Sequence, residues 1–291
     1  HALQNHDEMT YELVHFATLH AGDTFSFRRK PILGGDLATL IRAELTEKLT
    51  GDNGPYNSTF TTNGIASTTA SIIAASLGLN DLSALTSENI EAIKKAHLLL
   101  AMYNAWQPGV FALSGWDLVG ALPLERKQVA ALIKDGDTRW IHRGAYDLLD
   151  FAPEATESTS RIPKARSLYG SLTTQLADDT SFASKLRDIL TARARHGLAT
   201  GEQVDIPATS HKGMLVLVHR LADADQITVL NFSSETVSGS VRSLELTPGS
   251  KVVDMMTEAP VGEVDDLHSL YVVLQPHEGR SLLVLRPSES D

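Results

Sequence analysis

Hydrogen-bonding and acidic side chains gather close to the start of the chain, where Asn5, His6, Asp7 and Glu8 follow one another. Glycosyl transfer uses groups of this kind. A carboxylate stabilises the oxocarbenium-like transition state, and neighbouring polar side chains bind sugar hydroxyls. On spacing alone, the alternative is a helix start, in which Asp7 caps a helix over residues 11–19.

A second polar group follows the short apolar run at residues 110–113. The run is typical of a strand that is buried on both faces, and Ser114 to Asp117 stand at its carboxyl end. Ala2 and Leu3 precede the first polar group as though they also end a strand. In a (β/α)8 barrel the carboxyl ends of the strands build the active site. Trp116 and Asp117 are therefore candidates to line a pocket, with core packing as the alternative for Trp116.

The elements that position these groups are expected to be mostly helices over the first two hundred residues. The spacing of apolar residues predicts helices over residues 36–49, 66–77, from 87 to before Pro108, and 181–196. The expected caps are Asp36, Ser87, and either Thr180 or Ser181, with Gly197 ending the last helix. The stretch over 120–165 has no long period and predicts an irregular insertion, a frequent place for function.

After Gly201 the apolar residues change to the alternation of strands. Six runs separated by turn residues predict an antiparallel β-sandwich: 214–219, 227–232, 237–246, 251–256, 270–275 and 281–286. We therefore expect two domains, an α/β part over residues 1–201 and an all-β part over residues 202–291.

Four segments carry a resemblance to a known family: residues 1–20, 107–124, 135–148 and 163–172. Asn5-His6-Asp7 resembles the strand-seven motif of α-amylase-type glycoside hydrolases, and the longer segments resemble the trehalose synthases (maltose α-D-glucosyltransferases) of that family. The resemblance implies the C-terminal part of a (β/α)8 TIM barrel, strands seven and eight with their helices, followed by an antiparallel β-sandwich.

The same resemblance implies roles for single residues. Asp7 corresponds to the catalytic carboxylate that steadies the transition state, His6 and Asn5 to groups that contact the same sugar, and Trp116 and Asp117 to the loop after strand eight. The implied activity is the interconversion of maltose and trehalose by retaining double displacement. The family's nucleophile and general acid/base lie before this motif, so we expect the 291 residues alone to be inactive.

Two other interpretations stay open at this point. A chain without the catalytic pair also fits a non-catalytic carbohydrate-binding or assembly fragment. An enzyme of the same family that acts as an α-glucosidase or on sucrose is the other alternative. The chain opens at His1 without Met, a leader or a tag, from which we expect a longer protein whose N-terminal portion completes the barrel.

Composition excludes several classes of protein. A formal net charge of −11 argues against nucleic-acid binding, and no apolar run approaches a membrane span. The absence of cysteine fits a reducing cytoplasm. We expect maltose, trehalose and glucose as ligands, no metal among the catalytic groups and no cofactor, with a homo-oligomer left open. Asp52, Asn53 and Asn57 offer oxygens for Ca²⁺, although a plain turn is the alternative.

Overall fold

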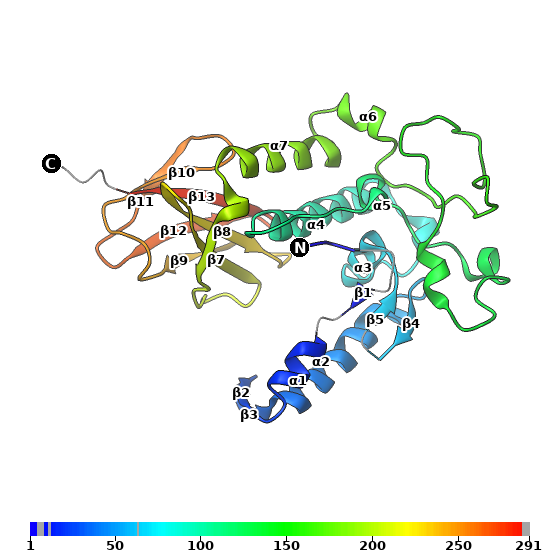
Figure 1. Ribbon diagram of the computed structural model, residues 1–291, viewed down its shortest axis with the longest axis horizontal. Helices are drawn as coiled ribbons and strands as arrows, with labels where there is room; N and C mark the ends of the chain where they lie inside the picture. Colours follow the sequence, from blue (N-terminus) through cyan, green and yellow to red (C-terminus); the bar gives the residue numbers. More distant parts are fainter. Residues whose placement is uncertain (5–8, 11–12, 63, 287–291) are drawn as a thin grey trace. The chain divides into compact units, whose positions relative to one another are not determined.

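The computed structural model describes residues 1–4, 9–10, 13–62 and 64–286, and the chain divides into two compact units (Figure 1). The first unit comprises residues 1–3, 95–112 and 178–291. The second comprises residues 4–94 and 113–177. The division falls within helix α4 (Ser87–Ala105), which therefore contributes residues to both units.

The first unit is built on an antiparallel sheet of six strands in the order β11-β10-β13-β8-β7-β6. These strands are β6 (Glu202–Asp205), β7 (Met214–Arg220), β8 (Ala224–Asn231), β10 (Lys251–Asp254), β11 (Pro260–Glu263) and β13 (Gly279–Leu285). A second sheet pairs β9 (Val237–Arg242) with β12 (Ser269–Leu274). Apolar side chains of both sheets, among them Val229, Val272 and Leu282, form one buried core. The antiparallel sandwich expected after Gly201 is confirmed.

Helices pack on the face of the sheet of six that points away from the second sheet. Neighbouring residues of a strand point to opposite sides, so one strand contributes to both cores. Leu282 belongs to the core between the sheets, whereas Leu283 packs against Trp106 after α4 and Ile189 of α7 (Phe182–Arg195). The buried Arg193 of α7 donates to the backbone carbonyl of Gln107 at 2.6 Å and to those of Ala105 and Gly109. These bonds fix the segment that follows α4.

Residues 1–3 lie beside the segment that follows α4. Ala2 forms a parallel bridge with Ala112, and the Ala112 backbone N–H donates to the His1 carbonyl at 2.8 Å. Parallel pairing is what the sequence predicts for neighbouring strands seven and eight of a (β/α)8 barrel. The strand expected over 110–113 is reduced to this bridge, because within the described residues only position 2 pairs with it.

The second unit begins with small sheets and helices. A three-stranded sheet joins β1 (Met9–Thr10), β5 (Gly64–Ala66) and β4 (Ser58–Thr61), and a hairpin pairs β2 (Thr24–Phe27) with β3 (Lys30–Leu33). The helices are α1 (Leu13–Leu19), α2 (Gly34–Leu49) and α3 (Thr69–Ser76).

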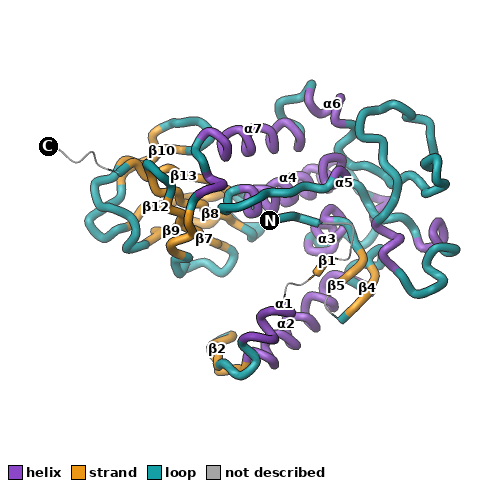
Figure 2. The backbone as a smooth tube through the Cα atoms, viewed as in Figure 1, coloured by secondary structure: helices purple, strands orange, loops and turns teal. Residues whose placement is uncertain are grey.

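The rest of the second unit is mostly loop, drawn in teal in Figure 2. Its helices are the short α5 (Gly115–Val119) and α6 (Leu172–Leu176). The 3₁₀ turns are η1 (Gly51–Asn53), η2 (Leu82–Ala84), η3 (Arg126–Val129) and η4 (Thr138–His142), with η5 (Leu198–Thr200) in the first unit. The irregular insertion expected over 120–165 is therefore confirmed. Apolar side chains of this stretch, including Val129 and Ile141, form a core of their own.

Several helix ends differ from the sequence-based expectation. Asp36 does not cap α2, because the helix begins at Gly34 and places Asp36 within its first turn. The cap before α4 is Thr86, whose side chain and backbone exchange hydrogen bonds with Asn89. The expected cap at the start of α7 is confirmed, because the Ser181 hydroxyl accepts from the Ser184 backbone N–H.

The helix expected over 11–19 is described as α1 (Leu13–Leu19), after strand β1, and its expected cap Asp7 lies outside the described residues. Contacts group the sheets with residues 95–112 and 178–201, because α7 and the end of α4 pack on the sheet. A boundary between residues 201 and 202 stays a prediction. Among the described residues, none of the helices has the length and apolarity needed to cross a membrane.

Candidate functional site

Three of the candidate residues, Asn5, His6 and Asp7, lie outside the described residues. The structure does describe Gln4, directly before them, and shows how it is held. The buried Gln4 amide donates to the Ser67 carbonyl, and its oxygen accepts from the Thr69 backbone N–H at 3.0 Å. Both bonds join the start of the chain to the first turn of α3 and the residues before it, so the backbone that leads into position 5 is fixed on one side.

The loop after residue 113 holds Gln4 from another direction. The Ser114 hydroxyl donates to the Gln4 backbone carbonyl, although the two residues are 110 positions apart in the sequence. Ser114 is also the residue directly before helix α5. This hydrogen bond therefore places Gln4, the last described residue before Asn5, beside the start of the helix that carries Trp116 and Asp117.

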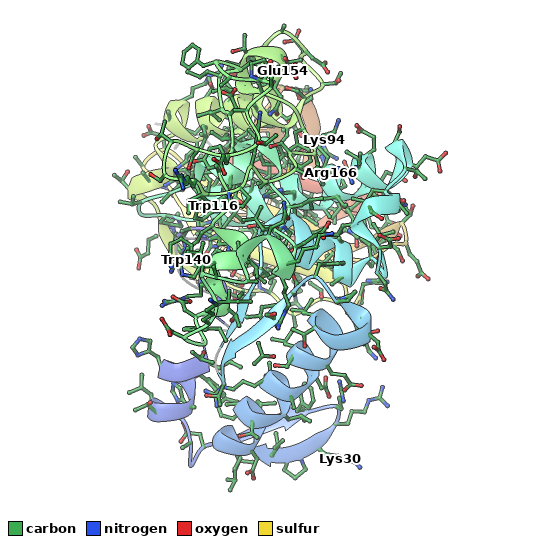
Figure 3. All side chains as sticks on the ribbon, turned by 90° about the vertical axis from the view of Figure 1, so that its right-hand side faces the viewer. Lys30, Lys94, Trp116, Trp140, Glu154 and Arg166 are labelled. Carbon is green, nitrogen blue, oxygen red and sulfur yellow. The ribbon has the colours of Figure 1, made fainter. Side chains whose placement is uncertain are left out.

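Trp116 is partly buried in the core of the irregular stretch. Its ring meets the ring of the buried His142 edge to face, with centroids 6.3 Å apart, and both Trp116 and Trp140 pack against the same apolar cluster (Figure 3). The Trp116 indole N–H is buried and has no hydrogen-bond partner within the described part of the chain. A buried indole N–H is ordinarily satisfied, so this donor is free to bind an acceptor supplied by something else.

Asp117 is a buried carboxylate with two tyrosines beside it. Its side chain belongs to a residue that is 1% exposed, in the first turn of α5. Burial and the negative charge of Asp117 raise the pKa of Tyr146, and the same two causes, with Glu91, raise the pKa of Tyr169 well above its usual range. Both phenols therefore stay protonated, so two neutral tyrosines surround the carboxylate of Asp117.

Glycines at the two ends of α5 make room for these tyrosines. A Cβ at Gly115 would lie 2.3 Å from the Tyr146 hydroxyl oxygen, and one at Gly120 would lie 2.6 Å from Cε2 of Tyr169. Gly120 also has a positive φ of 59°, a conformation that favours glycine. A short helix bounded by glycines thus lets two aromatic rings approach the backbone on either side of Trp116 and Asp117.

The turn that carries Tyr169 is held by Gln175. This buried side chain donates from Nε2 to the Leu118 carbonyl at 2.7 Å and to the Gly170 carbonyl at 3.1 Å. The backbone N–H of Tyr169 donates to the Val119 carbonyl at 3.1 Å. The position of the tyrosine relative to α5 is therefore set by several bonds to the backbone of that helix.

Trp116 and Asp117 were predicted from the sequence to line a pocket, whereas Tyr146, Tyr169 and His142 were not predicted. The missed residues lie in a stretch without periodicity, and no spacing rule connects them to α5. They do fall within the segments 135–148 and 163–172, which carried the family resemblance, and this was the only available indication.

Two of the three residues considered for Ca²⁺, Asn53 and Asn57, make hydrogen bonds to the protein. The buried Asn57 donates to the Leu49 carbonyl at 2.8 Å and accepts from the Ser71 hydroxyl at 2.6 Å, and Asn53 donates to the Glu47 carbonyl. Over residues 1–4, 9–10, 13–62 and 64–286, no group of three His, Asp or Glu side chains gathers in the manner of a metal site. Calcium binding stays a prediction.

No protein-family model matches the sequence, and no curated protein matches it. Similar solved structures include an α-amylase from Geobacillus thermoleovorans with acarbose, at 15% identity and a TM-score of 0.44, covering 69% of this chain and 36% of that one. The trehalulose synthase MutB from Pseudomonas mesoacidophila MX-45 has 18% identity and a TM-score of 0.49, covering 66% and 38%. AmyP with maltose has 15% identity and a TM-score of 0.47, covering 72% and 38%. The chain thus spans less than two-fifths of these proteins, and at such scores the likeness assigns no activity.

Proposed function

We propose that these 291 residues are part of an intramolecular glucosyltransferase that interconverts maltose and trehalose. The observation that carries the proposal is the hydrogen bond from the Ser114 hydroxyl to the Gln4 carbonyl. It joins the residue directly before Asn5 to the residue directly before the helix of Trp116 and Asp117. Each of these two residues precedes one of the groups that the sequence singled out for sugar chemistry.

In this proposal Asp7 faces the glucosyl ring at the bond that is cleaved. Its negative charge stabilises the positive charge that develops on the ring in the transition state, and His6 and Asn5 bind hydroxyls of the same ring. Trp116 offers an apolar face and a buried indole N–H that has no partner among the described residues, and Asp117 places a carboxylate in the same short helix. A site that mixes aromatic surfaces with a few polar groups suits a sugar.

The reaction is a double displacement with a covalent intermediate. A carboxylate nucleophile attacks the anomeric carbon of the non-reducing glucose of maltose, and the bond to the second glucose breaks as a general acid protonates the leaving oxygen. The released glucose turns within the pocket, gives the proton of its anomeric hydroxyl back to the same acid/base, and attacks the glucosyl-enzyme to form trehalose. The nucleophile and acid/base belong to polypeptide other than these residues.

Water must be excluded between the two steps, because hydrolysis of the glucosyl-enzyme competes with transfer. The loops around residues 51–64 and 120–165 are the candidates for this shielding. Both lie in the second unit, together with Trp116 and Asp117.

Product analysis tests the function directly. The complete enzyme, incubated with maltose, is expected to give trehalose in excess over free glucose, whereas the purified 291-residue chain gives neither. Formation of glucose without trehalose would identify a hydrolase instead. Turnover of maltose by the 291-residue chain free of other subunits would contradict the assignment of the catalytic pair to other polypeptide.

The substitution Asp7→Asn in the complete enzyme tests the central residue. We expect kcat to fall about 10³-fold or more, because charge stabilisation specific to the transition state is lost while the side chain keeps its shape. The matched control is Asp23→Asn, at an exposed carboxylate paired with His20, which should leave kcat unchanged. A near-normal kcat for Asp7→Asn in a folded enzyme would show that the assignment is wrong.

A further inference from the structure

A cavity of about 630 Å³ opens in the second unit, apart from Trp116 and Asp117, which do not line it. Its walls come from four segments of the chain: residues 55–56, 80–83, 122–128 and 164–166. The volume lies within the range of small-molecule sites, roughly 300–1,000 Å³. Parts of the loops around residues 51–64 and 120–165 form its walls, but the residues proposed to contact the sugar do not appear among its described lining, so the cavity needs an explanation of its own.

Three cationic side chains, Arg126, Lys164 and Arg166, line the cavity. Among the described residues, none of them lies within ion-pair distance of a carboxylate. The concentration of positive charge is notable because the chain as a whole carries a formal net charge of −11. Lys164 acts at longer range on Asp147, whose pKa it helps to lower. Cations gathered at one concave surface, of which the two arginines have no carboxylate within ion-pair distance among the described residues, favour a negatively charged ligand.

Most of the hydrogen-bond donors on these cations remain available. Arg126 donates one N–H to the Ser58 hydroxyl, and Arg166 donates one to the Leu82 carbonyl at 2.6 Å. A guanidinium carries five N–H donors in a planar fork, so each arginine keeps several for a ligand. Lys164 donates to the Pro153 carbonyl at 3.0 Å and to the Ala152 carbonyl at 3.3 Å, which holds its ammonium group in place.

Two carboxylates also line the cavity, and both already have partners. Asp81 accepts from the Ser83 backbone N–H at 2.8 Å and from the Ser83 hydroxyl at 2.6 Å. Glu125 forms an ion pair with Lys127 at 2.5 Å. The lining therefore keeps one more positive than negative charge, and the positive charges are the ones with unused donors.

The remaining wall combines apolar residues with the polar Asn80, Ser83 and Gln128. Tyr56, Leu82 and Leu124 line the cavity, and the Tyr56 hydroxyl is occupied because it donates to the Leu79 carbonyl at 2.8 Å. The phenol ring therefore offers its face rather than its hydroxyl. A cavity with cations and an aromatic wall suits a ligand that has an anionic head and an organic body.

We propose that this cavity binds a small phosphate monoester, with Arg126 and Arg166 on the phosphate and the organic body against Tyr56. The arginine fork matches the geometry of phosphate oxygens, and such charge-assisted bonds are stronger than neutral ones. The cavity is large enough for a body of the size of a hexose. Neither Trp116 nor Asp117 belongs to this site, and its test does not require the proposed glucosyl transfer.

Isothermal titration calorimetry of the complete protein tests the site with three probes: glucose 6-phosphate, inorganic phosphate and glucose. We expect saturable binding of glucose 6-phosphate that weakens with added salt, weaker binding of inorganic phosphate, and none of glucose. Arg126→Gln and Arg166→Gln should each weaken glucose 6-phosphate binding about tenfold, as expected for the loss of a partly solvated charge-assisted bond.

The matched control is Arg161→Gln, at an exposed arginine of the same unit that does not line the cavity, and it should leave binding unchanged. Arg126→Lys and Arg166→Lys keep the positive charge and should bind glucose 6-phosphate with intermediate affinity. They provide the test if a glutamine variant fails to fold. Absence of saturable glucose 6-phosphate binding by the unmodified protein overturns the proposal. So does equal affinity for glucose and its phosphate, or for the ester and inorganic phosphate, or an equal loss in Arg161→Gln.

Discussion

The sheet of six strands and the surroundings of helix α5 bury polar side chains in opposite ways. In the sheet of six strands, His219, Gln226, Thr228 and Ser281 are fully buried and neutral, and Gln226 contacts each of the other three: 2.6 Å to His219 Nδ1 and 2.5 Å to the Thr228 and Ser281 hydroxyls. Beside α5, the buried group is the acid Asp117.

The difference indicates where function resides. A neutral network satisfies its own members and mainly specifies how a sheet packs. A buried acid near protonated phenols is harder to explain by packing, since burial of charge is unfavourable. Perturbed ionisable groups gather at functional sites, although structural clusters also perturb them. We therefore expect substitutions beside α5 to change activity and substitutions in the sheet network to change stability.

Between these two regions, the largest effect is expected for Asp117→Asn in the complete enzyme. The amide keeps the shape of the side chain and removes the charge that polarises a bound hydroxyl, so we expect kcat/KM for maltose to fall about 10²-fold. The matched control is Asp150→Asn, at an exposed residue of the same unit. Kinetics measure the loss, and circular dichroism checks the fold. Wild-type kinetics in a folded Asp117→Asn enzyme would break the comparison between the two regions.

The sheet network should respond to Gln226→Leu with a loss of stability. Leucine fills a similar volume and leaves His219, Thr228 and Ser281 without their shared partner, which costs about 2–4 kcal/mol of unfolding free energy. Urea unfolding measures this change, and kcat should stay as in the unmodified enzyme. Gln203→Leu, at an exposed position on the neighbouring strand β6, is the control and should be nearly neutral. A loss of kcat without a loss of stability would reverse the roles of the two regions.

The two regions also differ in how far their sequences predict them. Alternation predicted β7, β8, β10 and β13, because each strand buries a continuous side in a regular sheet. The edge strands β6 and β11 were missed, since edge positions are exposed and their residues show no alternation. Likewise α7 was predicted with its Ser181 cap and Gly197 stop, because its apolar stripe repeats over several turns.

The region beside α5 could not be predicted in this way. Asp117 was identified by its place after an apolar run, but its contact with Tyr169 depends on a turn at Gly120 and on bonds from Gln175 across a long loop. Neither the turn nor the bonds from Gln175 correspond to a periodic pattern in the sequence. Asp36 shows the same limit on a smaller scale: it fits a cap by type, yet the hairpin before α2 starts that helix earlier.

A third prediction separates backbone strain from the contact with Tyr169. Gly120 and Gly197 both have a positive φ, 59° and 62°, so alanine costs roughly 1–2 kcal/mol at either position. The nearest atom to a Cβ at Gly197 is 4.0 Å away, whereas at Gly120 it would overlap the Tyr169 ring. We therefore expect Gly120→Ala to be about 1–3 kcal/mol more destabilising than Gly197→Ala in urea unfolding. Equal effects would show that Tyr169 moves aside easily.

The smallest expected effect is the response of the sheet network to acid. Burial lowers the pKa of His219, partly offset by its bond to Gln226, so the folded protein holds this imidazole neutral. Below the unfolded pKa, near 6.5, the unfolded chain binds a proton that the folded chain does not, and stability falls as pH falls. His219→Gln should therefore flatten the decline in urea stability between about pH 7 and pH 5.

The control for this measurement is His268→Gln, at a histidine of the same unit for which burial is only partial. His277, whose pKa is also lowered by burial, should retain its share of the decline in both variants. An unchanged slope in His219→Gln would mean that the buried imidazole takes up its proton without unfolding. The sheet network would then tolerate a charge, and charge alone would no longer distinguish it from the acid beside α5.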